Sequence, residues 1–531
     1  MTPPMLRSTE PLEPRLALAG VLSFFDVDGD VVTIRSDRGT DRDLAAAASL
    51  TPAGLGVQLS RVNLSTPVFA GARVRITSED SGAGDRQVHV GEIVANADLT
   101  AVEVDGDLGR FDIGDDDATD RSLGRLTVRS LGVFGTATGA SGTLSRVRGG
   151  IGTLAVAGDV RGAFVTVAGH LRALAVGGDI DGTGDAAGVQ AQSIGSATVG
   201  GSLLGGSQFS SGTLKVFGSI GTIRIGGGVL GGAGESSGTI MSLGRLRDVT
   251  IGGSLVGGTG LSSGRITAGV GGIERLTIGG IFGGSHDRTG QVESLDGIGT
   301  VRIATSLVGG SGLDSGSVLA ARGIGNLWLG GDIVGGANVF SGSVAAGGRI
   351  GRLHVGSIVA DLGLFSGSIK AGRLGTVSVR SSITGSATRQ AVISALGPTG
   401  RAIESLSVGG SITNALVLAG YDGGTPASGD VQIGSVTVGQ NLVATSIVAG
   451  VLGVTPGQFG RIGDSILGGS TRARIDSVTV GGSAVGSGNP AESFGVSAGT
   501  VGLVRIGGAR YRFTPGIISS PAGDNFGIHD L

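Results

Sequence analysis

A step of Ser or Thr followed by Gly recurs about every 26 residues through the middle of this chain. An aliphatic residue stands two positions after each of these glycines. A fixed period of this size is the signature of stacked units that share one continuous core, so we predict a solenoid. The steps are Ser211-Gly212, Ser237-Gly238, Ser263-Gly264, Thr289-Gly290, Ser315-Gly316, Ser341-Gly342 and Ser366-Gly367, and the aliphatic residues are Leu214, Ile240, Ile266, Val292, Val318, Val344 and Ile369.

Each repeat contains two further aliphatic runs. The first alternates, as in Ile223-Arg224-Ile225, which predicts a strand with one face inward. The second is a pair such as Leu255-Val256, usually followed by Gly-Gly. Runs this short, bounded by glycine, cannot form stable helices. We therefore predict an all-β fold, a right-handed parallel β-helix (β-solenoid) with coils of about 26 residues, three short strands per coil and irregular β caps. Roughly thirteen to fifteen coils are expected.

The composition fits a solenoid fold. Glycine contributes 109 of 531 residues, but there is no G-X-Y period and 40% of residues are hydrophobic, which excludes collagen and argues against a disordered linker.

The chain is expected to divide into four parts. We expect an export-related segment at 1–20, an irregular β region at 21–150 that leads into and caps the solenoid, the solenoid itself at 151–506, and a C-terminal cap at 507–531. The cap contains Tyr511, Arg512, Phe513 and Phe526.

Charge and cysteine content exclude several classes of function. The formal net charge is -3 and the arginines are scattered, so no nucleic-acid partner is expected. The absence of cysteine rules out disulfides, cysteine-based zinc sites and cysteine nucleophiles. Gly, Ser and Arg interrupt every apolar stretch, so we expect no membrane-spanning segment.

Three alternating carboxylates near the N-terminus form the one candidate metal site. Asp26, Asp28 and Asp30 surround an Asp-Gly step between two strand-like runs, which is a hairpin signal. Oxygen-only ligands would suit calcium, the one cofactor that we consider. An EF-hand needs glycine where Val31 stands, so that motif does not apply. A plain turn without metal is the other interpretation.

No catalytic residues emerge from the repeat. Parallel β-helices can carry polysaccharide lyases and hydrolases, which need clustered carboxylates on one exposed face. The outward positions of the alternating run carry none: they are Arg224, Thr250, Thr277, Arg302, Trp328, His354 and Ser378. Other polar residues are expected at different corners of different coils, namely Glu235, Glu274, Arg275, His286, Asp287, Arg288, Glu293 and Asp314. The sequence thus favours a protein that is not an enzyme, with a β-helix polysaccharide lyase or hydrolase as the alternative.

Two resemblances bear on location. The segment Leu12-Glu13-Pro14-Arg15, followed by Leu16-Ala17-Leu18, resembles the LEPR-XLL segment at the N-termini of large secreted proteins, chiefly from planctomycetes, with Ala17 in place of one Leu. The repeat style resembles the β-helical shafts of bacterial adhesins and autotransporter passengers. The LEPR-XLL resemblance implies export to the cell surface or beyond, and the shaft resemblance implies a structural or adhesive role. Together with the lack of a carboxylate cluster, they lead us to expect a non-enzymatic structural or adhesive protein that is extracellular or at the cell surface. Its partner would be a surface glycan or another surface protein. A calcium-stabilised binding module is a further alternative.

Overall fold

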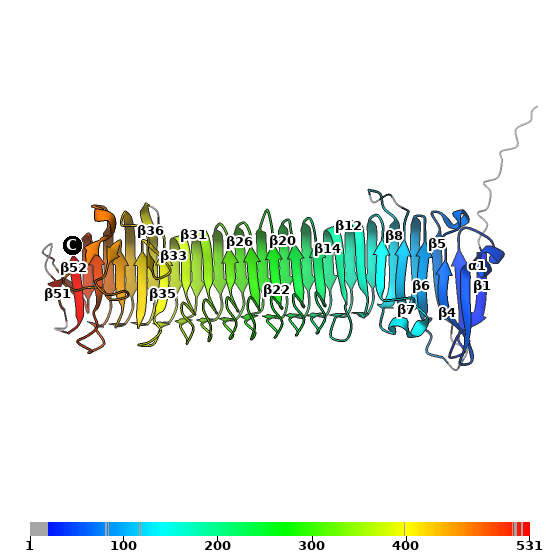
Figure 1. The fold of residues 1–531 in the computed structure, drawn as a ribbon, viewed down its shortest axis with the longest axis horizontal. Coiled ribbons are helices and arrows are strands. Elements are labelled where there is room, and N and C mark those ends of the chain that lie inside the picture. The colour runs from blue at the N-terminus through cyan, green and yellow to red at the C-terminus, as the bar shows by residue number, and fades with distance from the viewer. Residues whose placement is uncertain are drawn as a thin grey trace, which may run out of the picture.

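Most coils contain three strands, as the three aliphatic runs predict, and in several coils two of these strands continue as one. In the computed structural model, the coils stack into a parallel β-solenoid of about 16 turns, and the molecule is one elongated body (Figure 1). The structure describes residues 20–531 except 80, 81, 83, 116, 118, 398, 512, 514–517, 522 and 523. The LEPR-like segment and Arg512 lie outside the described residues. The predicted all-β parallel solenoid with coils of about 26 residues is confirmed.

The alternating runs form the longest of three parallel ladders, called here the long ladder. Its register places Ile223 beside Val249 and Val249 beside Leu276, so aliphatic residues stack on aliphatic residues. From the fourth coil onward its strands are β10 (Ile151–Val156), β12 (Phe164–Val176), β14 (Gly188–Val199), β17 (Ile220–Ile225), β20 (Leu246–Ile251), β23 (Ile273–Ile278), β26 (Ile298–Ile303), β29 (Ile324–Leu329), β31 (Val344–Val355), β33 (Ile369–Val379), β36 (Gly400–Val408), β41 (Val431–Val438), β46 (Arg474–Val480) and β49 (Thr500–Ile506).

The run after each Ser/Thr-Gly step forms the medium ladder, and the aliphatic pairs form the short ladder. The medium ladder contains β9 (Leu144–Val147), β16 (Thr213–Val216), β19 (Thr239–Ser242), β22 (Arg265–Ala268), β25 (Gln291–Ser294), β28 (Val318–Ala320), the first halves of β12, β14, β31 and β33, then β35 (Ala391–Ala395), β38 (Ala415–Ala419), β43 (Ser446–Ala449), β48 (Phe494–Ala498) and β52 (Phe526–Asp530). The short ladder contains β11 (Val160–Arg161), β13 (Ile180–Asp181), β15 (Leu203–Leu204), β18 (Val229–Leu230), β21 (Leu255–Val256), β24 (Ile281–Phe282), β27 (Leu307–Val308), β30 (Ile333–Val334), β32 (Ile358–Val359), β34 (Ile383–Thr384), β37 (Ile412–Thr413), β42 (Leu442–Val443) and β47 (Ala484–Val485).

One aliphatic core runs through the coils. Ile266, Val292 and Val318 are stacked in register on the medium ladder, and each side chain is fully buried. These rows belong to one continuous cluster with the inward residues of the other two ladders. Because each coil covers its apolar rows only with the neighbouring coils, the hydrophobic effect selects stacking over separate domains.

The Ser/Thr-Gly step closes a corner by hydrogen bonding. The buried Ser315 Oγ accepts a bond from the Gly310 N–H (3.0 Å) and donates one to the Gly312 carbonyl (2.7 Å). Thr289 makes the equivalent bonds one coil earlier. Gly316 has a φ of 61°, and a Cβ there would lie 2.0 Å from the Val308 carbonyl oxygen. A residue without Cβ is therefore required directly after the hydroxyl.

The corner before the hydroxyl brings successive coils into backbone contact. A Cβ on Gly310 would lie 2.0 Å from the carbonyl oxygen of Gly284, and Gly284 meets Gly258 in the same way at 2.1 Å. Side chains cannot fit between these corners, because backbone atoms of one coil already touch those of the next.

Coil stacking begins well before residue 151. Parallel pairing starts with β4–β6 and β5–β7, and β1, β2 and β3 add antiparallel strands at that end. The coils there differ in length: Ile151 pairs with Leu171, and Leu171 with Ile194, so these coils have 20 and 23 residues. Unequal coils hide the period, which explains why the predicted thirteen to fifteen turns fall short of about 16. The elements are β1 (Gly20–Phe25), β2 (Val31–Ser36), α1 (Asp41–Ala47), β3 (Ala48–Ala53), β4 (Gly56–Asn63), β5 (Arg73–Glu79), β6 (Val90–Ala95), β7 (Leu99–Ile113) and β8 (Leu123–Leu131).

Longer corners and an antiparallel edge mark the C-terminal coils. The hairpins β39 (Tyr421–Asp422) to β40 (Thr425–Pro426) and β44 (Val451–Leu452) to β45 (Ser465–Ile466) are insertions between coils. Tyr421, Val451 and Phe459 form a second apolar cluster with outward residues of the medium ladder. At the end of the stack, β50 (Ala509–Tyr511) pairs antiparallel with β49, and β51 (Ile518–Ser519) with β52, which covers strand edges that would otherwise be unpaired.

Candidate functional site

The three carboxylates predicted near the N-terminus do lie together, in the turn between β1 and β2. The predicted hairpin is present: the two strands pair antiparallel, and the Asp26 N–H bonds the Asp30 carbonyl at 3.0 Å. One carboxylate oxygen from each of Asp26, Asp28 and Asp30 lies within 4.8 Å of the others. Asp26 and Asp30 are buried and Asp28 is partly exposed.

Backbone N–H groups also hold each of these carboxylates. Asp26 Oδ1 accepts from the N–H groups of Gly29 (3.1 Å) and Asp30 (2.8 Å). Asp28 Oδ2 accepts from the Asp85 N–H at 2.9 Å, and Asp30 Oδ2 from the Arg86 N–H at 2.6 Å. The carboxylates therefore fasten the turn to the segment before β6, whether or not they bind a metal.

One carboxyl of this turn, that of Asp26, holds its proton more tightly than an ordinary aspartate. Burial, followed by the hydrogen bond and the charge of Asp28, raises the pKa of Asp26 to about 6. The same hydrogen bond lowers the pKa of Asp28. A cavity of about 130 Å³ lined by Asp26, Asp28 and His89 adjoins the turn. Hard oxygen ligands with adjoining space for water suit Ca²⁺, which takes six to eight oxygens.

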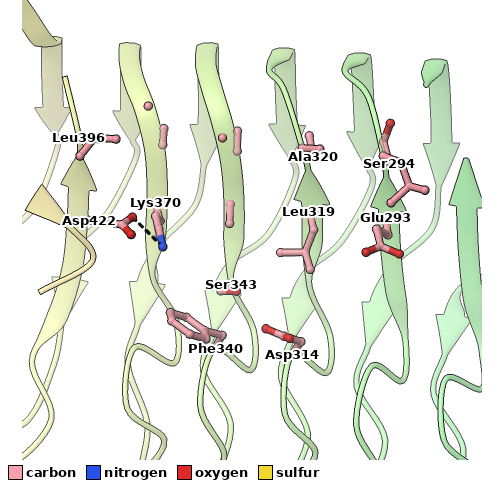
Figure 2. Close-up of a pocket in the computed structure, with 17 residues that line it drawn as sticks. Glu293, Ser294, Asp314, Leu319, Ala320, Phe340, Ser343, Lys370, Leu396 and Asp422 are labelled. Atoms are coloured by element: carbon pink, nitrogen blue, oxygen red, sulfur yellow. Dashed lines mark ion pairs between the residues drawn. The ribbon is translucent and has the colours of Figure 1, made fainter. Parts of the chain in front are cut away.

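A second site, a groove of about 460 Å³, lies on the outer face of the medium ladder (Figure 2). Its floor follows the outward residues of four successive coils, Glu293, Leu319, Ala345 and Lys370. Alanines and Leu319 make the floor apolar, and charged side chains lie at the two ends. At about 4.8 Å per coil, these ends are roughly 14 Å apart.

Each end of the groove carries an ion pair. Lys370 Nζ lies 2.7 Å from Asp422 Oδ1 in the β39–β40 hairpin and 5.9 Å from the centre of the Phe340 ring. At the other end Arg265 pairs with Glu293. Arg265 is mostly buried, and this burial lowers the pKa of its guanidinium. The hairpin thus closes the groove on one side, and the paired Glu293 limits it on the other.

Asp314 enters the same groove from a corner, with a φ of 53°. Burial, the largest effect, raises the pKa of Asp314, and the charge of Glu293 raises it further, while Arg288 lowers it. Glu293 and Asp314 lie in different coils, as expected, but Glu293 stands on β25 rather than at a corner, and both residues line one groove. Asp314 belongs to the next coil, and its corner turns the side chain toward the medium ladder (Figure 2).

Sequence reasoning missed Lys370, Phe340 and Asp422 as groove residues. The outward positions of the medium ladder contained a signal. Glu293 and Lys370 each stand one residue after the aliphatic residue that follows a Ser/Thr-Gly step. Asp422 gave no such signal, since its hairpin interrupts the period.

The outward positions predicted on the long ladder are confirmed. In β29, Trp328 is exposed between the buried Leu327 and Leu329, and Arg224 stands likewise in β17. These predicted positions carry no carboxylate, although Asp248 lies on the neighbouring row of the same face.

Comparisons with known proteins place no constraint on this chain. No family model, curated protein or solved structure matches it. Within the described part of the chain, no helix has the length and apolar character needed to cross a bilayer.

Proposed function

We propose that this chain is a non-enzymatic, exported structural or adhesive protein of the cell surface or extracellular space. The observation that supports this most is the unbroken stack of about 16 turns around one aliphatic core. Such a stack displays repeated rows of outward side chains over a long, rigid surface, which suits contact with an extended partner. The partner would be a surface glycan or another surface protein, and the LEPR-XLL resemblance supports export.

The location can be tested on intact cells that express the full chain with an epitope tag. We expect antibody labelling and protease cleavage of the tag without permeabilisation. Purified protein should then bind isolated cell envelopes in a pull-down assay, with no release of reducing sugars. Labelling that appears only after permeabilisation would contradict the proposal.

A polysaccharide lyase or hydrolase is the second candidate, and the carboxylate pair in the groove favours it. Asp314, with its raised pKa, could act as an acid, while Glu293, which pairs with Arg265, could act as a base or nucleophile. Activity should then fall by at least about 100-fold in both Glu293→Gln and Asp314→Asn. The assay is the release of reducing ends or unsaturated products from a polysaccharide panel, with Glu235→Gln as a control outside the groove.

A calcium-stabilised binding module is the third candidate, on the carboxylates of Asp26, Asp28 and Asp30. Calcium would have to displace the proton on Asp26, so its effect should weaken as the pH falls below about 6. A melting temperature that rises with Ca²⁺ in the parent but not in Asp28→Asn would support this site. Equal melting in EDTA and in Ca²⁺ at pH 7.5 would exclude it.

A further inference from the structure

The outer face of the long ladder carries two parallel rows of side chains. Over three successive coils these rows bring together aromatic, arginine and small polar side chains. In the first row, Arg302, Trp328 and His354 occupy successive coils in register. In the second row, Thr300, Asn326 and Arg352 do the same. Neighbours in a row are about 4.8 Å apart along the stack. These six residues line a hollow of about 510 Å³, called here the Trp328 hollow.

An aromatic platform forms the centre of the Trp328 hollow. Trp328 is the one tryptophan of the chain, and 42% of its surface is exposed. The His354 ring lies nearly parallel to it, with 6.4 Å between ring centres and 9° between ring planes. Tryptophan presents a large, rigid apolar face together with a polar N–H, which suits the face of a sugar ring in a wet site.

The hollow carries positive charge that has no ion-pair partner among the described residues. Arg302 and Arg352 are exposed, and neither side chain makes an ion pair or a hydrogen bond with any residue that the structure describes. By contrast, Arg349 bonds Glu404 at 2.9 Å and Arg275 lies 3.4 Å from Asp248 on nearby coils. None of the described residues that line the hollow has a carboxylate. Two free guanidinium groups of this kind favour carboxylate ligands.

We propose that the Trp328 hollow binds an acidic polysaccharide whose chain runs along the solenoid axis. This inference rests on the proposed adhesive function and names its ligand class. Arg302 and Arg352 hold carboxylates of the glycan, one sugar ring stacks on Trp328, and Asn326 and Thr300 bond hydroxyl groups. The two arginines stand two coils, or about 10 Å, apart along the axis. A linear polymer that carries a carboxylate on every sugar can meet both.

The single tryptophan makes the site directly observable. The full-length protein is titrated with oligogalacturonate of six sugars, and emission is read after excitation at a wavelength that selects tryptophan. The matched ligand is the same oligomer with its carboxylates reduced to alcohols. We expect a saturable emission change with the acidic oligomer, weakened by salt, and little change with the neutral one.

Variants separate this site from the rest of the surface. Arg302→Gln and Arg352→Gln should each weaken binding about tenfold, because each removes a charge-assisted contact. Trp328→Ala should abolish retention in affinity electrophoresis on a gel that contains the acidic polymer. Arg224→Gln is the matched control: it stands in the same row as Arg302, is exposed, and removes the same charge outside the hollow.

Each contrary result has a distinct meaning. No emission change and no retention with the acidic oligomer would overturn the inference, as would equal binding of the neutral oligomer. Binding that survives in Arg302→Gln and Arg352→Gln, or weakens as much in Arg224→Gln, would refute the site but leave a glycan-binding protein. Failure of surface labelling, with binding at Trp328 intact, would refute the proposed location and function but not the site.

Discussion

The corner hydroxyl offers the sharpest test of how this fold is held together. In Ser315→Ala the Gly310 N–H loses its one acceptor, and the Gly312 carbonyl keeps only the weaker 3.3 Å bond from the Ser315 N–H. Ser315 and Gly312 are buried and Gly310 is partly buried, so water cannot fully replace the hydroxyl without opening the corner. An unsatisfied buried donor costs about 1–3 kcal/mol and a lost hydrogen bond about 1 kcal/mol. Because the Gly310 N–H is only partly buried, we expect a local loss in the lower part of the summed range, about 2–3 kcal/mol.

The matched control is Ser315→Thr, because Thr289 fills the equivalent corner with the same two hydrogen bonds. Hydrogen–deuterium exchange read by mass spectrometry is the suitable assay, since a stacked repeat can open locally rather than unfold in one step. Peptides that cover residues 305–318 should exchange roughly 30- to 140-fold faster in Ser315→Ala, which is the expected free energy converted at 1.4 kcal/mol per tenfold. Exchange as slow as in the parent, or equal acceleration in Ser315→Thr, would refute the role given to the hydroxyl.

Three further predictions test the core, the corners and the N-terminal turn. Ile266→Asp places an unpaired charge in the continuous core and should lower the free energy of unfolding by more than about 4 kcal/mol. We expect the cooperative melt in circular dichroism to be lost. A melt like that of Ile266→Val would contradict the inward position of Ile266. Ser262→Gly relieves a φ of 56° and should raise stability by about 0.5–1 kcal/mol in chemical denaturation, whereas Ser263→Gly, which removes the corner hydroxyl, should lower it. Because the folded pKa of Asp26 is raised from 3.8 to about 6, its protonation favours the folded state below that range, and this contribution is lost as the pH rises through 6. Without calcium, Asp26→Asn should therefore melt at a higher temperature than the parent at pH 7, and the difference should shrink toward pH 4.

The middle coils could be predicted in detail because packing leaves them little choice. Once Ile240, Ile266 and Val292 must lie over one another, the coil length and the inward faces follow. The N-terminal coils keep the same register with unequal corners, as the pairing of Ile151 with Leu171 shows, so no fixed period marks them. A fixed sequence period therefore indicates coil stacking only where successive corners have the same length.

The candidate sites were predictable to a lesser degree. Asp26, Asp28 and Asp30 could be found because they share one turn of local sequence. Glu293 and Asp314 are 21 residues apart and line the same groove because the residue before the Ser/Thr-Gly step is left-handed. This conformation recurs with the repeat, but residues such as Asp314, which are not glycine, do not reveal it in the sequence. The Trp328 hollow needed the register itself, since free arginines can be told from paired ones only when neighbouring coils are in place.

The contact between successive glycine corners also determines the mechanics of the stack. Because the backbone at Gly310 already touches Gly284, and Gly284 touches Gly258, this corner cannot be compressed without atomic overlap, and stretching it would break ladder hydrogen bonds. About 16 turns at about 4.8 Å each give a length of roughly 75 Å. The solenoid is therefore a spacer of fixed length. Groups attached near its two ends are held at one separation, which changes only when whole coils are added or removed.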